Sequence, residues 1–116
     1  MKRGSGRAQR LGDLMQRELS ELIRLELRDP RVGMITLTSV DVSPDMSHAK
    51  VFFTMLEKEK LEDTLHGLKR SAGFLRSQLA RRMSMYTTPE LRFAYDESIE
   101  RGDRLSQLID AANRKS

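Results

Sequence analysis

Apolar residues near the start of the chain recur three or four positions apart, a spacing that predicts an amphipathic helix from Arg7 to Arg28. Asp29 and Pro30 follow this segment. A residue that precedes a proline is disfavoured in the helical region of backbone space, so we expect the helix to end there. The apolar face of the predicted helix consists of Leu11, Leu14, Met15, Leu19, Leu22, Ile23 and Leu27.

The next two segments are rich in β-branched and aromatic residues and predict a β-hairpin. The strands are expected at Met34 to Val42 and Ala49 to Leu56, with the turn-forming Ser43-Pro44-Asp45 between them. In the first strand the apolar positions change from odd to even residue numbers midway. Such a change of phase predicts a bulge or a strong twist near Ser39.

A second helical pattern runs to Met83, and its apolar stripe passes through a glycine. An acidic segment, Glu57 to Asp63, suits the start of this helix, where the helix dipole favours negative charge. Ser71-Ala72-Gly73 lies in its middle, and a glycine inside a helix costs about 1 kcal/mol relative to alanine. We therefore predict a kinked or two-part helix that bends at these three residues and turns Phe74 inward. The stripe consists of Leu61, Leu65, Leu68, Ala72, Leu75, Leu79 and Met83.

After Pro89, apolar residues alternate from Glu90 to Tyr95 and predict a third strand. Asp96 is a candidate N-cap for a final helix with a weaker apolar pattern, since aspartate accepts hydrogen bonds from the free N–H groups of a helix start. The predicted order is helix, strand, strand, kinked helix, strand and final helix.

The composition narrows the class of protein. A chain of 116 residues can form one domain with a single modest core. It has no cysteine, which excludes disulfides, thiol catalysis and cysteine metal sites. No apolar run approaches the roughly 18–20 residues that a membrane span needs. The N-terminal MKRGSGRAQR is basic but no hydrophobic core follows it, so we expect a flexible basic arm and not a secretory signal.

The charge balance favours an acidic partner. The 21 Lys and Arg residues exceed the 17 Asp and Glu residues, which gives a formal net charge of +4. Such an excess is typical of proteins that bind nucleic acid or an anionic membrane surface, although a solvated charged surface is the simple alternative.

The sequence offers little for catalysis. His48 and His66 belong to different predicted elements and lack a metal-ligand spacing; the first is expected at the hairpin turn or the start of the second strand, the second on a helix surface. No phosphate-binding loop, nucleophile elbow or dinucleotide-binding motif is present. We therefore predict no catalytic residue, no metal or cofactor site and no small-molecule substrate.

Two groups of basic residues are candidate RNA contacts. Arg10, Arg17 and Arg24 lie seven apart and would follow one side of the first helix, drifting about 20° per heptad. Because glutamates are interleaved with them, a solvated face is the alternative. In the second helix no acid occurs between Asp63 and Glu90, which suits the binding of several phosphates. The alternative there is pairing with acids elsewhere in the fold. This second group consists of Lys69, Arg70, Arg76, Arg81 and Arg82.

Aromatic residues make up only 5% of the chain, and there is no tryptophan. Phe52, Phe53, Phe93 and Tyr95 fall in predicted strands, where we expect them to belong to the core and not to stack on bases. Proteins that read single strands usually expose stacking aromatics. The prediction is therefore recognition of a structured RNA through its phosphates and sugars.

Several stretches, taken in order, resemble the ribosome-binding factor A family. The resemblance runs from about Arg7 to Leu108, nearly the whole chain. No single motif is decisive, but the set in this order is specific. The stretches are the helix that ends in Asp29-Pro30-Arg31, TLTSVDVSPD (36–45), AKVFF (49–53), SAGFLRSQLA (71–80), PELRF (89–93) and YDESIERG (95–102).

The resemblance implies an α+β fold of the type II KH-like kind, in the order helix, strand, strand, helix, helix, strand, with the helices on one face of a three-stranded sheet. The expected division is a flexible basic arm at 1–6, a KH-like RNA-binding domain at 7–108 and a C-terminal tail at 109–116. It also implies a monomeric, non-catalytic assembly factor of the bacterial cytoplasm. Such a factor binds the immature small (30S) ribosomal subunit, contacts 16S rRNA and assists late maturation, including at low temperature.

An ordinary KH domain clamps the nucleic-acid backbone with a GXXG loop, which this chain lacks. The family instead carries an A-x-G kink at that place, and the matching residues are Ser71, Ala72 and Gly73. Serine in the first position departs from the family pattern; its hydroxyl can bond to a preceding carbonyl, which tends to bend a helix. A protein-interaction module of another RNA-associated complex is the alternative function.

Overall fold

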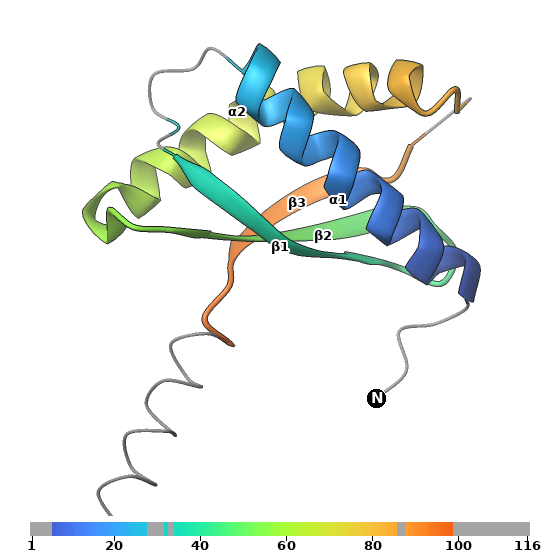
Figure 1. The fold of residues 1–116 in the computed structure, drawn as a ribbon, viewed down its shortest axis with the longest axis horizontal. Coiled ribbons are helices and arrows are strands. Elements are labelled where there is room, and N and C mark those ends of the chain that lie inside the picture. The colour runs from blue at the N-terminus through green and yellow to red at the C-terminus, as the bar shows by residue number, and fades with distance from the viewer. Residues whose placement is uncertain (1–5, 28–31, 33, 86–87, 99–116) are drawn as a thin grey trace, which may run out of the picture.

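The computed structural model describes residues 6–27, 32, 34–85 and 88–98, and it has the predicted α+β architecture (Figure 1). Two helices lie on one side of a three-stranded sheet with the strand order β1-β2-β3. No helix in the described ranges is both long and apolar enough to cross a membrane. The elements in chain order are α1 (Gly6–Glu26), β1 (Ile35–Val42), β2 (His48–Met55), the 3₁₀-helix η1 (Lys58–Lys60), α2 (Leu61–Arg82) and β3 (Glu90–Tyr95).

A single apolar core joins both helices to one face of the sheet. Alternate residues of β2, among them Val51 and Phe53, are fully buried, as expected for a strand with one covered face. The stripe predicted for each helix supplies the opposite side of this core. The fully buried leucines and methionine of the helices are Met15, Leu19, Leu22, Leu68, Leu75 and Leu79.

Helix α1 approaches β1 closely at a glycine. A Cβ atom built on Gly12 would lie 2.4 Å from the carbonyl oxygen of Val40, closer than real Cβ contacts come. Only a residue without a side chain therefore lets α1 pack at this distance from the strand.

The predicted hairpin and its bulge are confirmed. Strands β1 and β2 pair antiparallel, with Leu37 opposite Phe53 but Ser39 opposite Phe52, so Thr38 is the extra residue. The hydroxyl of Thr38 donates a hydrogen bond to Asp96 Oδ2 at 2.5 Å. The bulge explains the change of phase in the sequence, because it returns the later valines of β1 to the core.

Strand β3 pairs parallel to β2 at the bounds that the alternation predicted, so α2 is the crossover between two parallel neighbours. One edge of β3 faces β2 and the other is the edge of the sheet. Just after β3, Asp96 Oδ1 accepts a hydrogen bond from the backbone N–H of Ser98 at 2.8 Å, a contact of the kind that an N-cap makes, while the cap itself stays a prediction. The predicted final helix, residues 1–5 of the arm and the tail at 109–116 lie outside the described residues, and Gly6 already belongs to α1.

The predicted division of the second helical region into two helices is wrong, since α2 is continuous from Leu61 to Arg82. Ser71, Ala72 and Gly73 all lie inside α2. A bend of the helix axis at these residues stays a prediction. The expected inward turn of Phe74 is also wrong, because its side chain is 44% exposed. In an uninterrupted helix this position lies about 150° from the apolar stripe, which accounts for its exposure.

Candidate nucleic-acid interface

A groove of about 660 Å³ lies between α2 and the edge strand β3. We call it the α2–β3 groove. Its cations come from both elements: Lys69 and Arg76 from the helix, Arg92 from the strand. No acid in the described ranges forms an ion pair with any of the three, so the lining sets three positive charges against the single carboxylate of Glu90. The other lining residues are Leu65, Ala72, Gly73, Glu90, Leu91 and Phe93.

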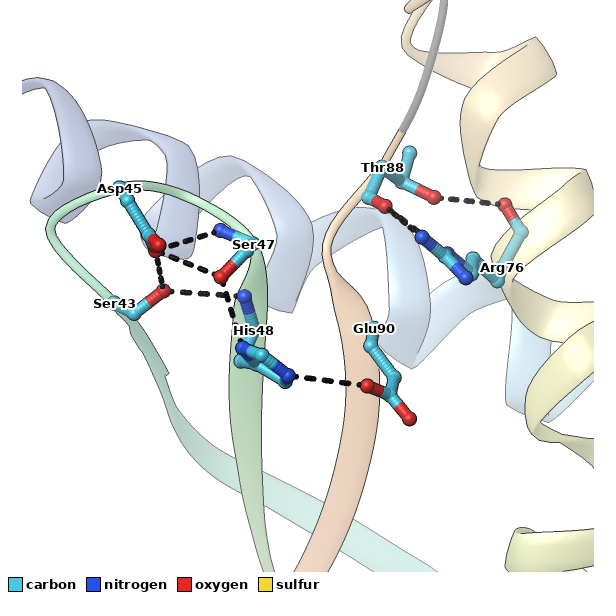
Figure 2. A network of polar contacts seen from close by, with 7 residues as sticks. All are labelled: Ser43, Asp45, Ser47, His48, Arg76, Thr88 and Glu90. Carbon is cyan, nitrogen blue, oxygen red and sulfur yellow. Dashed lines mark hydrogen bonds and ion pairs between the residues drawn. The ribbon is translucent and has the colours of Figure 1, made fainter.

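Arg76 holds the helix to the segment that enters β3 (Figure 2). Its Nε and Nη2 atoms donate to the backbone carbonyl of Thr88 at 3.0 and 2.8 Å. The hydroxyl of Thr88, a residue only 5% exposed, donates in return to the carbonyl of Arg76 at 3.3 Å. Because the guanidinium bonds to a neutral backbone carbonyl and to no acid within the described residues, its positive charge is not offset by an ion pair beside the groove.

A second polar network ties the β1–β2 turn to the start of β3 (Figure 2). Asp45 accepts hydrogen bonds from the hydroxyls of Ser43 and Ser47 at 2.7 and 2.8 Å and from the Ser47 N–H at 3.1 Å. The Ser43 bond, followed by those of Ser47, lowers the pKa of Asp45 from 3.8 to about 2. His48 Nε2 lies 3.1 Å from Glu90 Oε1, so the acid of the groove already has a partner.

The same network brings a hydroxyl and an imidazole together, which the sequence did not suggest. Ser47 Oγ lies 2.9 Å from His48 Nδ1, and Glu90 contacts the other ring nitrogen. However, the single hydrogen of that hydroxyl has a carboxylate acceptor in Asp45, and all four side chains are exposed to water. The arrangement stabilises a turn and offers no activated nucleophile. Within the described residues there is also no group of three or more potential metal ligands.

The basic residues predicted on α2 separate into three kinds. Lys69 and Arg76 line the α2–β3 groove, whereas Arg70 and Arg81 are exposed outside it. Arg82 does not belong with the free cations, because it forms ion pairs with two glutamates of α1. The alternative of pairing with acids elsewhere in the fold therefore holds for this residue.

The ion pairs of Arg82 join the two helices. Its Nε lies 2.8 Å from Glu18 Oε1, and its Nη2 contacts Glu21 Oε1. The hydrogen bond to Glu18, and then that to Glu21, raises the pKa of Arg82 above its ordinary value. Arg82 is thus a link between α1 and the end of α2.

Arg10, Arg17 and Arg24 are exposed on α1, on a different part of the protein from the α2–β3 groove. Arg17 and Arg24 line a separate hollow of about 790 Å³ between α1 and β1. Its other walls are mostly apolar, and Met34 at its side is 93% exposed.

Two features of the groove could not be predicted from the sequence: the presence of Arg92 and the open surroundings of Gly73. Arg92 occupies a polar position in an alternating strand, but nothing in the sequence places β3 beside Lys69. Gly73 is exposed, and a Cβ atom added to it would meet nothing within 4 Å. Intramolecular packing therefore gives no reason for a glycine at this helical position.

Comparisons with known proteins agree on one family. The pattern of the family described as ribosome-binding factor A matches residues 7–109. Ribosome-binding factor A of Dechloromonas aromatica is 56% identical over 115 residues, which cover 99% of this chain and 94% of the relative. That of Azoarcus sp. is 58% identical over 110 residues, covering 94% and 87%.

A crystal structure and a fitted homology model show the same likeness. The crystal structure of ribosome-binding factor A from Thermus thermophilus has a TM-score of 0.68 at 33% identity, covering 76% of this chain and 93% of that one. A homology model of the Thermus thermophilus factor, fitted into a cryo-EM map of its complex with 30S, has a TM-score of 0.59 at 30% identity, covering 74% and 91%.

Proposed function

Because this chain belongs to the ribosome-binding factor A family, and its fold is KH-like as in that family, we propose that it binds the immature small (30S) ribosomal subunit and contacts 16S rRNA through the α2–β3 groove. The proposal draws on the neighbour whose fitted structure is described as part of a 30S complex. It assigns to this chain the role of an assembly factor in the cytoplasm that assists late maturation, including at low temperature.

The observation that carries the proposal is the charge of the α2–β3 groove. Lys69, Arg76 and Arg92 face it without an acidic partner in the described ranges, while Glu90 contacts His48. Cations arranged along a groove bind consecutive phosphates and release their counterions, the main source of affinity for nucleic acid. The open side of Gly73 would let a sugar–phosphate backbone approach the helix closely.

The proposed mechanism is binding without catalysis. A monomer would hold the rRNA in an intermediate conformation, and its release would mark maturation. Arg70 and Arg81, exposed on α2, and the row Arg10, Arg17 and Arg24 on α1 would add contacts outside the groove.

The test is co-sedimentation with immature small subunits over a salt series. Lys69→Glu and Arg92→Glu should lower the affinity and flatten its dependence on salt, because each removes a phosphate contact. Lys60→Glu is the control for charge: Lys60 is exposed, undergoes the same charge change and lies outside the groove. The ion pair with Glu57 that it loses is exposed and contributes little to stability. Equal affinity and an equal salt slope for the groove variants and wild type would show that the groove is not the RNA site.

The hollow between α1 and β1 favours a second candidate function, a protein-interaction module of an RNA-associated complex. Its walls are largely apolar, and an exposed apolar side chain such as Met34 is more typical of protein contacts than of RNA contacts. Competition separates the two functions. Free 16S rRNA should displace the protein from immature subunits if the main contact is RNA, and should fail to do so if it is a docked protein.

A further inference from the structure

The face of the sheet that the helices leave open carries two cations and an aromatic ring. Lys50 and Arg92 are exposed, whereas their chain neighbours Ala49, Val51 and Leu91 are buried in the core beneath the helices. This alternation places both cations on the opposite face of the sheet.

Phe52 shares that open face. It is half-buried and does not belong to the core cluster, which corrects the expectation that it would be a core residue. The ammonium of Lys50 lies 5.6 Å from the centre of the Phe52 ring, within the range of a cation–π contact.

The two cations lie side by side on adjacent strands of the open face, without an anion between them. Lys50 and Arg92 are register partners on β2 and β3, and like charges in this position are destabilising. Neither forms an ion pair within the described part of the chain. They line a hollow of about 460 Å³ that also contains Asp41, the register partner of Lys50 on β1, and His48, which contacts Glu90. The lining of this hollow thus sets two full positive charges against the single carboxylate of Asp41.

Arg92 belongs to both concave surfaces. It lines the α2–β3 groove on one side of β3 and the open-face hollow on the other. Because β3 is the edge strand, no further strand separates the two surfaces among the described residues. A basic track therefore leads from Lys69 through Arg92 to Lys50.

We propose that an RNA strand held in the α2–β3 groove continues across the free edge of β3 onto the open face of the sheet. Arg92 and Lys50 contact its phosphates there, and the ring of Phe52 stacks on a base. The track ends at Phe52, because this ring also lines a hollow that contains Asp96 and Glu97, which repel phosphates. This inference rests on the proposed function, since it extends the same RNA site.

The test compares unstructured RNA strands of two lengths by fluorescence anisotropy. A strand of about four nucleotides fills the groove alone, and one of about ten also reaches the open face, within the range of site sizes known for single strands. Wild type should bind the longer strand more tightly. Lys50→Glu and Phe52→Leu should weaken only this longer strand, by about fivefold or more for a lost stacked base. Phe52→Tyr keeps a ring and should retain the affinity, and Lys60→Glu controls for charge.

The salt dependence gives a second readout. Lys50→Glu combined with Arg92→Glu should reduce the salt slope for the longer strand by about 1.4, since each phosphate contact on a single strand contributes about 0.7. Thermal unfolding confirms that these exposed variants remain folded.

The outcomes separate the two proposals. If Lys69→Glu abolishes binding of both lengths while Lys50→Glu and Phe52→Leu bind the longer strand like wild type, the open-face track is wrong and the groove stands. If Lys69→Glu binds both lengths like wild type, the groove is wrong, and the continuous track is overturned with it. Equal affinity of wild type for the two lengths would likewise overturn the track.

Discussion

The same substitution, glycine to alanine, should have opposite effects at two helical positions of this protein. Alanine is favoured over glycine inside a helix by about 0.5–1 kcal/mol, because glycine loses more backbone entropy on folding. At Gly73 a new Cβ atom meets nothing within 4 Å. Gly73→Ala should therefore raise the free energy of unfolding by this full amount.

At Gly12 the same gain is outweighed by a clash. The new Cβ atom would lie 2.4 Å from the Val40 carbonyl oxygen and 3.5 Å from a methyl group of Val42. The close contact is with backbone, so α1 must move away from β1 and loosen the core between them. Overpacking of this kind costs about 1–3 kcal/mol, so Gly12→Ala should be destabilising by about 1–2 kcal/mol net.

Urea unfolding monitored by circular dichroism measures both values. Thermal unfolding should show a Tm raised by about 2–5 °C for Gly73→Ala and lowered by about 4–10 °C for Gly12→Ala, for a chain of this size. A stabilised Gly12→Ala would refute the close approach of α1 to β1. A destabilised Gly73→Ala would refute the open surroundings of that residue. Gly73→Ala should also bind immature small subunits more weakly, because Gly73 lines the α2–β3 groove and a methyl group adds bulk to its wall. Unchanged affinity would mean that the RNA does not approach the helix there.

Three further predictions concern the polar contacts. Arg76→Ala leaves the carbonyl of the buried Thr88 without its donors and should lower the free energy of unfolding, measured in urea, by about 1–3 kcal/mol. An unchanged free energy would mean that these bonds do not fix β3 to α2. Arg82→Ala removes both ion pairs to α1 and should lower the Tm slightly, and the Tm difference from wild type should shrink in high salt. A Tm difference that does not depend on salt would point to lost packing instead. Asp45 has a pKa lowered from 3.8 to about 2, so its contribution to stability is complete above about pH 4 and is lost as the pH falls toward 2. Asp45→Asn should remove that part of the acid sensitivity. An unchanged dependence of stability on pH would contradict the prediction.

Much of the fold could be read from local patterns. The spacing of leucines predicted α1 to within a residue or two, and the alternation in ELRFAY predicted β3 at its observed bounds. Even the bulge at Thr38 was visible, because an inserted residue shifts the parity of all apolar positions after it. These predictions succeeded because burying one face of a helix or strand requires apolar residues at a regular spacing along the chain.

The candidate site was predicted less completely. Lys69 and Arg76 were identified from an acid-free helix, but the same argument included Arg82, which pairs with acids from a distant helix. Arg92 and Lys50 were missed, since their neighbourhood depends on the parallel pairing of β3 with β2. The composition around Gly73 suggested a break, yet α2 continues because its apolar stripe is buried on both sides of the glycine.

The sequence by itself determined the class of the elements, the core face of each and the excess of positive charge, because each of these follows from residues close together in the chain. Only the tertiary structure decided which charges are free and which surfaces they share. Ion pairs and grooves join residues that lie dozens of positions apart, and their geometry depends on how the helices pack on the sheet. The stretch around Gly73 shows the difference: the sequence marks it as unusual, and the packing shows that Gly73 is exposed and lines the α2–β3 groove.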